Sequence, residues 1–311
     1  MRILVVGAGA IGGYFGGRLL EAGRDVTFLV RPRRAAELAS AGLTIRSAAG
    51  NVTLPRPPTI LADQLRAPFD LVLLSCKAYD LDGAIASFAP AVGPGAAILP
   101  LLNGLRHLDI LDGRFGRAPA LGGLCYIAAT LDQHGAIVHL NTDHELAFGE
   151  PDGGQSDRIR AIAGEMAGVL FKPRTSENIL QDMWEKWVFL AALAGSTCLM
   201  RAAIGDIVGS PGGKDFVLGL IEECGAIAHA NGHPPGEAFR ARIQTALTAA
   251  GSTLTASMLR DIERNARIEA DHIVGDLIRR GDETSTRLGE ASPLRLAYAH
   301  LKAYEARQQR G

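Results

Sequence analysis

A glycine-rich segment next to the N-terminus constrains the fold more than any other feature of this sequence. It reads Gly7-Ala8-Gly9-Ala10-Ile11-Gly12, follows a predicted strand at 2–6 and opens a predicted helix at 13–21. In such a unit the first glycine permits a tight turn, the second lets the backbone approach a pyrophosphate, and the third lets helix and strand pack closely. A glycine-rich turn of another α/β protein would explain the strand and the helix, but not this glycine spacing. We therefore predict that a dinucleotide binds at Gly7, Ala8, Gly9, Ala10, Ile11 and Gly12, with its negative charge facing the helix N-terminus.

The first half of the chain predicts a parallel sheet wrapped by helices. Short β-rich segments alternate there with helical stretches, and several are apolar throughout, as strands covered on both faces are. The predicted strands are residues 2–6, 25–30, 43–45, 69–75 and 96–101. Further short runs at 136–140 and 145–148, separated by polar turns, predict antiparallel strands that close this domain.

The second half predicts a helical domain, because glycine and proline become rarer after Pro173 and helical periodicity takes over. Thr175-Ser176-Glu177 has the hydroxyl and the early acid that are typical of a helix start. The predicted helices are residues 178–200, 216–230, 258–280 and 293–308. Because 311 residues exceed one comfortable core, we expect an α/β fold in two parts. These are an N-terminal Rossmann-like dinucleotide-binding domain at 1–172 and a C-terminal all-helical domain at 173–311 that completes the active site.

Composition argues against several classes of partner. Lys and Arg number 32 and Asp and Glu 33, so no strong field attracts nucleic acid or an acidic membrane surface. Glycines interrupt the N-terminal apolar run well short of the ~20 residues that a membrane span needs. The four cysteines form no CxxC and lie in apolar runs, which predicts buried thiols in a reducing compartment and a cytoplasmic protein. The eight histidines show no metal-ligating spacing, so we expect no metal.

The end of the second predicted strand indicates which dinucleotide is used. An acid at this point binds the ribose 2′-hydroxyl of NAD, whereas here the strand is followed by Arg31-Pro32-Arg33-Arg34. Guanidinium groups match a 2′-phosphate in geometry and in charge. A solvated basic loop is the plainer interpretation, but the position of the cluster favours NADP(H), with Arg31 as a ligand.

Two polar residues follow apolar runs at the ends of predicted strands, where ligands bind in parallel sheets. They are Lys77 and Asn103, and the latter precedes a glycine. Alone, each is ambiguous, since a lysine after a strand is commonly solvated and Asn-Gly is commonly a turn. Taken with the glycine-rich segment and Arg31, they resemble the ketopantoate reductase family, the 2-dehydropantoate 2-reductases.

The resemblance continues into the helical half. Trp184-Glu185-Lys186 resembles the family's W-x-K segment. Ser257-Met258-Leu259-Arg260-Asp261, followed by Glu269, resembles its S-M-x-x-D segment and the glutamate after it. Five separated motifs thus occur in the family's order over nearly the whole chain.

The resemblance implies NADPH-dependent reduction of a 2-oxo acid to a 2-hydroxy acid, as in the conversion of 2-dehydropantoate to pantoate in pantothenate biosynthesis. It implies that Lys186 is the catalytic acid and that Glu269 meets the reacting oxygen, the cofactor or Lys186. It also implies that Lys77 and Asn103 line the nicotinamide and substrate site, and that Ser257 contacts the substrate carboxylate. From the residues alone, Lys186 can equally face solvent, Glu269 can form a helix-face ion pair, and Ser257 can cap a helix, so these alternatives stay open.

The sequence departs from the family in the helix that carries Lys186. The family has asparagines at the positions of Leu190 and Ala194, and a proline where this chain has Gly195. The resemblance implies that those amides bind the substrate, including its terminal hydroxyl. Leucine and alanine remove the groups that reward a polar tail. We therefore expect Leu190 and Ala194 to lie in the substrate site of a related, less polar 2-oxo acid.

Two other functions are compatible with these residues. One is an NADP(H)-binding sensor or regulatory protein without turnover, which the missing amides favour and the retained Lys186 and Glu269 oppose. The other is a dehydrogenase that oxidises a 2-hydroxy acid. The resemblance implies a monomer or a homodimer, and the sequence does not choose between them.

Overall fold

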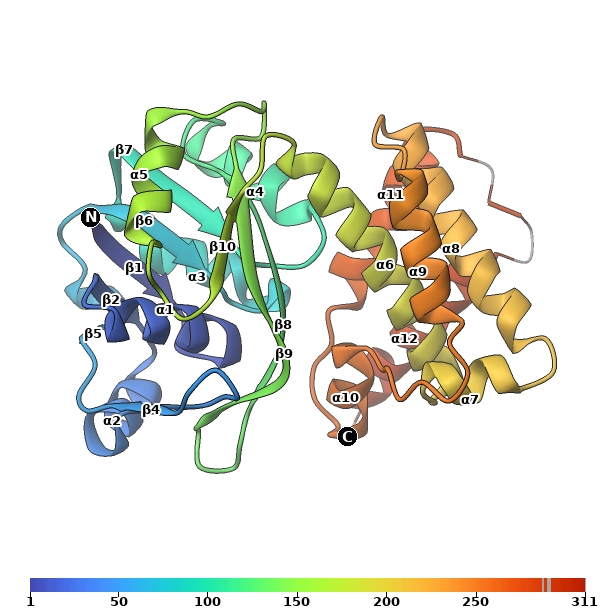
Figure 1. Cartoon of the computed structure of the whole chain (residues 1–311), viewed down its shortest axis with the longest axis horizontal. Helices are drawn as coiled ribbons and strands as arrows, with labels where there is room; N and C mark the ends of the chain where they lie inside the picture. The colour runs from blue at the N-terminus through green and yellow to red at the C-terminus, as the bar shows by residue number, and fades with distance from the viewer. Residues whose placement is uncertain (287, 290–291, 311) are drawn as a thin grey trace. The chain divides into compact units, whose positions relative to one another are not determined.

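The computed structural model describes residues 1–286, 288–289 and 292–310 (Figure 1). The chain divides into two compact units. Unit 1 consists of residues Met1–Leu102 and His107–Leu180, and unit 2 consists of Asn103–Arg106 and Gln181–Gly311. The short segment Asn103–Arg106 therefore belongs with the C-terminal helices although it lies in the first half of the sequence.

Unit 1 contains a five-stranded parallel sheet in the order β5-β2-β1-β6-β7. Its strands are β1 (Arg2–Val6), β2 (Asp25–Leu29), β5 (Thr59–Ile60), β6 (Phe69–Leu74) and β7 (Val92–Pro100). Leu71, Val72, Leu73 and Leu74 of β6 are fully buried, as expected for a strand covered on both faces. The helices of this unit are α1 (Ala10–Glu21), α2 (Pro32–Ala41), α3 (Leu81–Phe88), α4 (Arg106–Phe115), whose first residue belongs to unit 2, and α5 (Asp157–Glu165). The predicted Rossmann-like fold is confirmed.

A second sheet in unit 1 has the order β10-β9-β3-β4, with β8 paired to β9. Its strands are β3 (Leu43–Arg46), β4 (Val52–Leu54), β8 (Gly122–Leu131), β9 (Ile137–Gly149) and β10 (Lys172–Thr175). The predicted antiparallel addition is confirmed by β8 and β9, although β9 is one strand rather than two. The predicted strand at 43–45 exists but joins this sheet, because β3 pairs with β9 and β4.

The first unit ends later than the predicted boundary at residue 172. β10 pairs with β9 in parallel, with Lys172 opposite Glu145 and Thr175 opposite Phe148. These backbone pairs hold the chain against β9 as far as Thr175, and unit 1 extends to Leu180. The Oγ of Ser176 then accepts a hydrogen bond from the Asn178 backbone N–H at 3.1 Å, and the next helix begins at Ile179, one residue after its predicted start.

Unit 2 is helical, as predicted, and is built around the long helix α6 (Ile179–Met200), whose first two residues belong to unit 1. The other helices are α7 (Ile204–Gly209), α8 (Gly213–Ala230), α9 (Glu237–Leu247), α10 (Ser257–Glu263), α11 (Asp276–Glu283) and α12 (Pro293–Gln308). α12 begins as predicted, with Pro293 in its first turn and the Ser292 hydroxyl accepting from the Arg295 N–H. None of the helices in the described part of the chain combines the length and apolar character needed to cross a membrane.

The prediction of one helix over 258–280 is wrong. α10 ends at Glu263, and Asn265 follows with a φ of 56°, a left-handed conformation that stops a helix. Helical structure resumes as a single π turn, η4 (Asp271–Gly275), which leads directly into α11. Periodicity alone misses this break because both pieces keep apolar side chains at helical spacing.

Candidate functional site

The glycine-rich turn of unit 1 has the geometry that its sequence predicts. Gly7 has a φ of +94°, and its backbone N–H donates to the Leu29 carbonyl at 3.0 Å. A Cβ on Gly12 would lie 2.3 Å from the Gly7 carbonyl oxygen and 2.0 Å from the Oγ of Ser75. Both positions therefore exclude a side chain, since a methyl group at Gly12 would displace the turn itself.

Gly9 differs from Gly7 and Gly12 because the space beside it is open. Apart from Gly9 and its two chain neighbours, none of the described residues has an atom within 4 Å of where its Cβ would be. Gly9 precedes α1 in an extended conformation and its carbonyl accepts from the Gly13 N–H at 2.8 Å, so Ala10 and Ile11 form the first turn. The N–H groups of a first helical turn have no helical acceptor and attract anions. An open space bounded by such groups fits the pyrophosphate of a dinucleotide.

The three arginines after β2 have different partners. Arg31 is 80% exposed and forms an ion pair with Asp80 at 3.2 Å. Arg33 is also exposed and pairs with Glu37. Arg34 is largely buried, and its guanidinium donates to the carbonyls of Ala8 at 3.1 Å and Gly135 at 3.2 Å. The predicted cluster thus divides into two exposed arginines and one that supports the glycine-rich turn.

Lys77 lies at the sheet edge that also carries the glycine-rich turn. Val6 of β1 is opposite Leu74 of β6, so Gly7 and Lys77 follow neighbouring strands that end together. Lys77 is half-buried and precedes a short 3-10 turn at Ala78–Asp80. The carboxyl edge of a parallel sheet is where such folds bind ligands, as the sequence predicted for this residue.

Unit 2 places Lys186 against Asn103, which lies 83 residues earlier in the sequence. Lys186 is on α6 with only 7% of its surface exposed, and its Nζ donates a hydrogen bond to the Oδ1 of Asn103 at 2.9 Å. Burying an ammonium is unfavourable unless hydrogen bonds replace its water. Lys186 is therefore not the solvent-facing residue that an isolated helical lysine would be.

The residues around Lys186 form a rigid support. Trp187 is fully buried and its indole N–H donates to the carbonyl of Ile273 in η4 at 2.8 Å. Trp184 and Trp187 lie with ring centroids 5.0 Å apart. The Arg280 guanidinium lies 5.9 Å from the Trp184 ring and 5.8 Å from the Trp187 ring, a distance that permits cation–π attraction.

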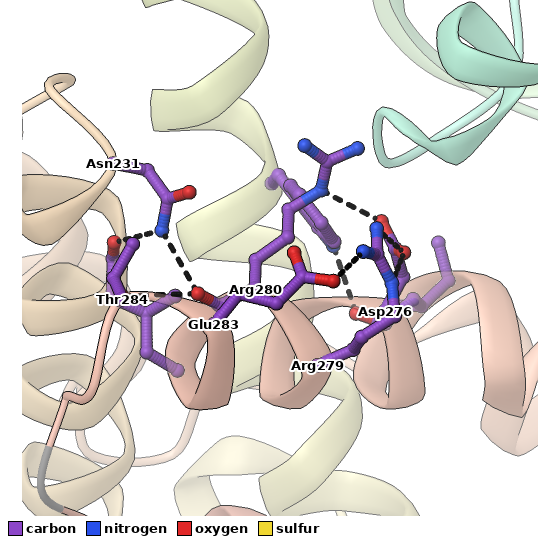
Figure 2. Close-up of polar contacts among 9 residues, drawn as sticks. Asn231, Asp276, Arg279, Arg280, Glu283 and Thr284 are labelled. Atoms are coloured by element: carbon purple, nitrogen blue, oxygen red, sulfur yellow. Dashed lines mark hydrogen bonds and ion pairs between the residues drawn. The ribbon is translucent and has the colours of Figure 1, made fainter.

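A buried carboxylate on α11 fixes Arg280 (Figure 2). Asp276 has no exposed side-chain surface and accepts from Arg280 Nε at 3.0 Å and from Arg279 at 2.6 Å. Arg279 also pairs with Glu283, one turn further along. The sequence reasoning missed this network, although acid and base at i, i+3 and i, i+4 spacing were visible in it.

The remaining predicted site residues all lie in unit 2. Glu269 is half-buried just before η4, and its carbonyl accepts from the Ile273 N–H at 3.0 Å. Leu190 and Ala194 lie one and two turns after Lys186 on α6, the former half-buried and the latter buried. Ser257 is the exposed first residue of α10. The alternative that Ser257 caps this helix is wrong, because Ala256 occupies the cap position and no side chain caps it.

Two cysteines in unit 2 have raised thiol pKa values. Burial raises the pKa of Cys198 to about 12 and also raises the pKa of Cys224. A thiol nucleophile needs a lowered pKa, so neither residue is suited to that role.

These features define a class of protein: an oxidoreductase with a Rossmann-type unit and a helical unit that carries a buried lysine. The profile of the family described as ketopantoate reductase PanE/ApbA matches residues 3–153, and the profile of its C-terminal part matches residues 178–305. The chain belongs to the ketopantoate reductase family.

Individual relatives agree with this assignment. The chain is 39% identical to the uncharacterized oxidoreductase YkpB of Bacillus subtilis, over 98% of this chain and 99% of that protein. It is similar to the crystal structure of 2-dehydropantoate 2-reductase from Methylococcus capsulatus, with a TM-score of 0.86, 29% identity and coverage of 99% and 98%. The fold is also that of D-mandelate dehydrogenase in its ternary structure with NADH and anilino(oxo)acetate, with a TM-score of 0.86, 19% identity and coverage of 99% and 100%.

Proposed function

We propose that this oxidoreductase reduces a 2-oxo acid to the 2-hydroxy acid with NADPH. The observation that carries the proposal is the buried ammonium of Lys186, held by the amide oxygen of Asn103 in a chain of the ketopantoate reductase family. A buried ammonium is both a proton donor and a fixed positive charge, which are the two properties that reduction of a ketone requires.

The proposed chemistry balances with one proton. When bound, NADPH supplies the hydride that adds to the substrate carbonyl carbon. The carbonyl oxygen then gains negative charge, and Lys186 donates a proton to it. Solvent returns the proton to Lys186, so one 2-oxo acid, one NADPH and one proton give one 2-hydroxy acid and one NADP⁺. Asn103 orients the ammonium, and Glu269 orients the reacting oxygen, the cofactor or Lys186.

We assign cofactor binding to unit 1 and the preference for NADPH over NADH to Arg31. The open space beside Gly9 and the first turn of α1 suit the pyrophosphate, and the exposed Arg31 suits a 2′-phosphate. Lys77, at the same sheet edge, contacts the nicotinamide half in this proposal. Because the D-mandelate dehydrogenase of the same fold is described with NADH, both cofactors belong in the test.

The substrate in this proposal is less polar than ketopantoate. The side chains of Leu190 and Ala194 cannot form a hydrogen bond with a hydroxylated substrate tail. A site that hydrogen-bonds a substrate hydroxyl strongly rejects substrates that lack this hydroxyl, whereas an apolar site does not. The D-mandelate dehydrogenase structure contains anilino(oxo)acetate, a 2-oxo acid derivative with an aromatic substituent. Ser257 contacts the carboxylate that all candidate substrates share.

A cofactor-absorbance assay tests this function. NADPH or NADH is mixed with ketopantoate, 3-methyl-2-oxobutanoate, 4-methyl-2-oxopentanoate and phenylglyoxylate, and NADP⁺ is mixed with the matching 2-hydroxy acids. We expect NADPH oxidation with a branched or aromatic 2-oxo acid at a higher kcat/KM than with ketopantoate. Cofactor binding without turnover of any acid would favour a sensor, and turnover only of the 2-hydroxy acids would favour an oxidative dehydrogenase. A homodimer and a cytoplasmic location stay predictions, which size-exclusion chromatography and cell fractionation test.

A further inference from the structure

The π turn η4 contacts Trp187 and Gly104, the sequence neighbours of the two residues in the Lys186–Asn103 hydrogen bond. A π turn within a helix is rare and occurs frequently at functional sites. This turn comprises Asp271–Gly275 and lies between Glu269 and α11.

On one side, the π turn holds α6. The carbonyl of Ile273 accepts the indole N–H of Trp187 at 2.8 Å, and both residues are buried. Trp187 adjoins Lys186 in the sequence, so this hydrogen bond fixes the part of α6 from which the ammonium projects.

On the other side, the π turn holds the Asn103–Gly104 segment. A Cβ on Gly104 would lie 2.9 Å from the His272 carbonyl oxygen and 3.2 Å from ring atom Cδ2, so the two backbones are in close contact. Gly104 has a φ of +76°, which favours glycine there. His272 is 6% exposed and hydrogen-bonds with the Asn103 backbone. The residue that accepts the Lys186 hydrogen bond is thus held by its own backbone and by its neighbour.

From this geometry we infer that His272 is a positioning residue: it holds the Asn103 backbone so that the Asn103 amide oxygen meets the Lys186 ammonium. The expected effect on rate rests on the proposed function, whereas the claim that His272 positions Asn103 does not depend on it. Burial and, to a smaller extent, Arg106 lower the pKa of His272, while Glu269, Asp276 and the hydrogen bond to the Asn103 backbone oppose that change. A neutral ring at neutral pH suits a hydrogen-bonding support rather than a second acid.

A double-mutant cycle tests the inference in the full chain. We expect His272→Phe to lower kcat by about 10-fold to 10²-fold, because small displacements of catalytic groups have effects of this size, and to leave NADPH binding unchanged. Asn103→Ala lowers kcat by itself. If His272 acts through Asn103, then adding His272→Phe to Asn103→Ala lowers kcat no further. The same fractional loss in both backgrounds would overturn the inference.

Two controls separate positioning from general packing. His300→Phe makes the same change at another histidine of unit 2, on α12, whose buried Nε2 has no hydrogen-bond partner among the residues that the structure describes, and should leave kcat unchanged. His272→Gln keeps a hydrogen-bonding side chain and should retain more of kcat than His272→Phe. It also serves as the test variant if His272→Phe does not fold.

Crystal structures of the parent and of His272→Phe provide a readout that needs no activity. The inference predicts a separation between Lys186 Nζ and Asn103 Oδ1 well beyond 2.9 Å in the variant. An unchanged separation would contradict it even if the rate fell. If the parent turns over no 2-oxo acid, the proposed function fails, and the two crystal structures still decide whether His272 positions Asn103.

Discussion

The glycine-rich turn of unit 1 and the Lys186–Asn103 pair of unit 2 are built in opposite ways. The turn works through main-chain groups and through the absence of side chains, with open space beside Gly9. The pair works through two side chains, one of them a buried charge, that meet across 83 residues of sequence. Binding a pyrophosphate needs only oriented N–H groups, whereas donating a proton needs an ionisable group in a controlled environment. We therefore expect substitutions in the turn to act on binding and those at the pair to act on rate.

The largest expected effect comes from Lys186→Ala. Removing the proton donor should lower kcat by about 10²-fold to 10⁴-fold, while the dissociation constant for NADPH, measured by fluorescence titration, stays the same. Lys214→Ala, at an exposed lysine of α8, is the matched control and should change neither quantity. A variant with parental kcat would show that Lys186 is not the proton donor. A large loss of NADPH binding would show that the Lys186–Asn103 pair acts on binding as well as on rate.

The glycine positions separate binding from folding within unit 1. Gly12→Ala should lower the free energy of unfolding by about 1–3 kcal/mol or more, because its methyl group overlaps the Gly7 carbonyl. Gly9→Ala should leave Tm unchanged and raise the NADPH dissociation constant by about 10²-fold, since its methyl group meets only the ligand.

Gly164→Ala controls for the loss of a glycine. This residue lies in α5 of unit 1, and the described residues outside the backbone of its own helix leave room for a Cβ there, so Tm should stay level or rise slightly. Calorimetry measures Tm, and titration measures the NADPH dissociation constant, for Gly12→Ala, Gly9→Ala and Gly164→Ala. Unchanged NADPH affinity in Gly9→Ala would mean that the pyrophosphate does not lie beside Gly9.

The arginines should show a smaller effect of the same kind. Arg31→Ala should raise the KM for NADPH by about 10-fold, the equivalent of one charge-assisted hydrogen bond, and leave the KM for NADH unchanged. Arg33→Ala should have little effect on either cofactor. Arg34→Ala should lower Tm, because its guanidinium holds the carbonyls of Ala8 and Gly135. If the ratio of the two KM values in Arg31→Ala equals that of the parent, the 2′-phosphate is bound by other groups.

The smallest expected effect is a pH dependence of stability that originates in unit 1. Burial lowers the pKa of His144, with further lowering by His139 and Arg18 and an opposing effect of Asp143. The Tyr14 hydroxyl also hydrogen-bonds to His144 Nδ1 at 2.7 Å. Below the ordinary histidine pKa of about 6.5 the unfolded chain binds more protons than the folded chain, so stability falls as the pH falls. His144→Gln should therefore reduce the slope of Tm against pH between about pH 7 and pH 5; an unchanged slope would assign the acid sensitivity to other groups.

Much of unit 1 could be predicted because its requirements are local. Gly7 and Gly12 need backbone freedom and close packing, and both needs appear directly as glycine at fixed spacing. The strands β1, β2 and β6 are short apolar runs and were predicted close to their observed bounds, whereas β7 begins four residues before its predicted start and the two-residue strand β5 was not predicted. The different roles of Arg31 and Arg34 could not be predicted, because they depend on whether the Ala8 and Gly135 carbonyls lie within reach.

The sequence by itself determined the alternation of strands and helices, the glycine-rich turn, the helical second half and the family motifs that single out Lys186. Tertiary structure decided that the helix predicted over 258–280 is interrupted, that a π turn follows, and that this turn supports Lys186 and Asn103 through Trp187 and His272. The physical reason is the range of the interactions. A turn or a helix start is stabilised by neighbours in sequence and leaves a local pattern, whereas a buried ammonium is stabilised by groups that only the folded chain brings together.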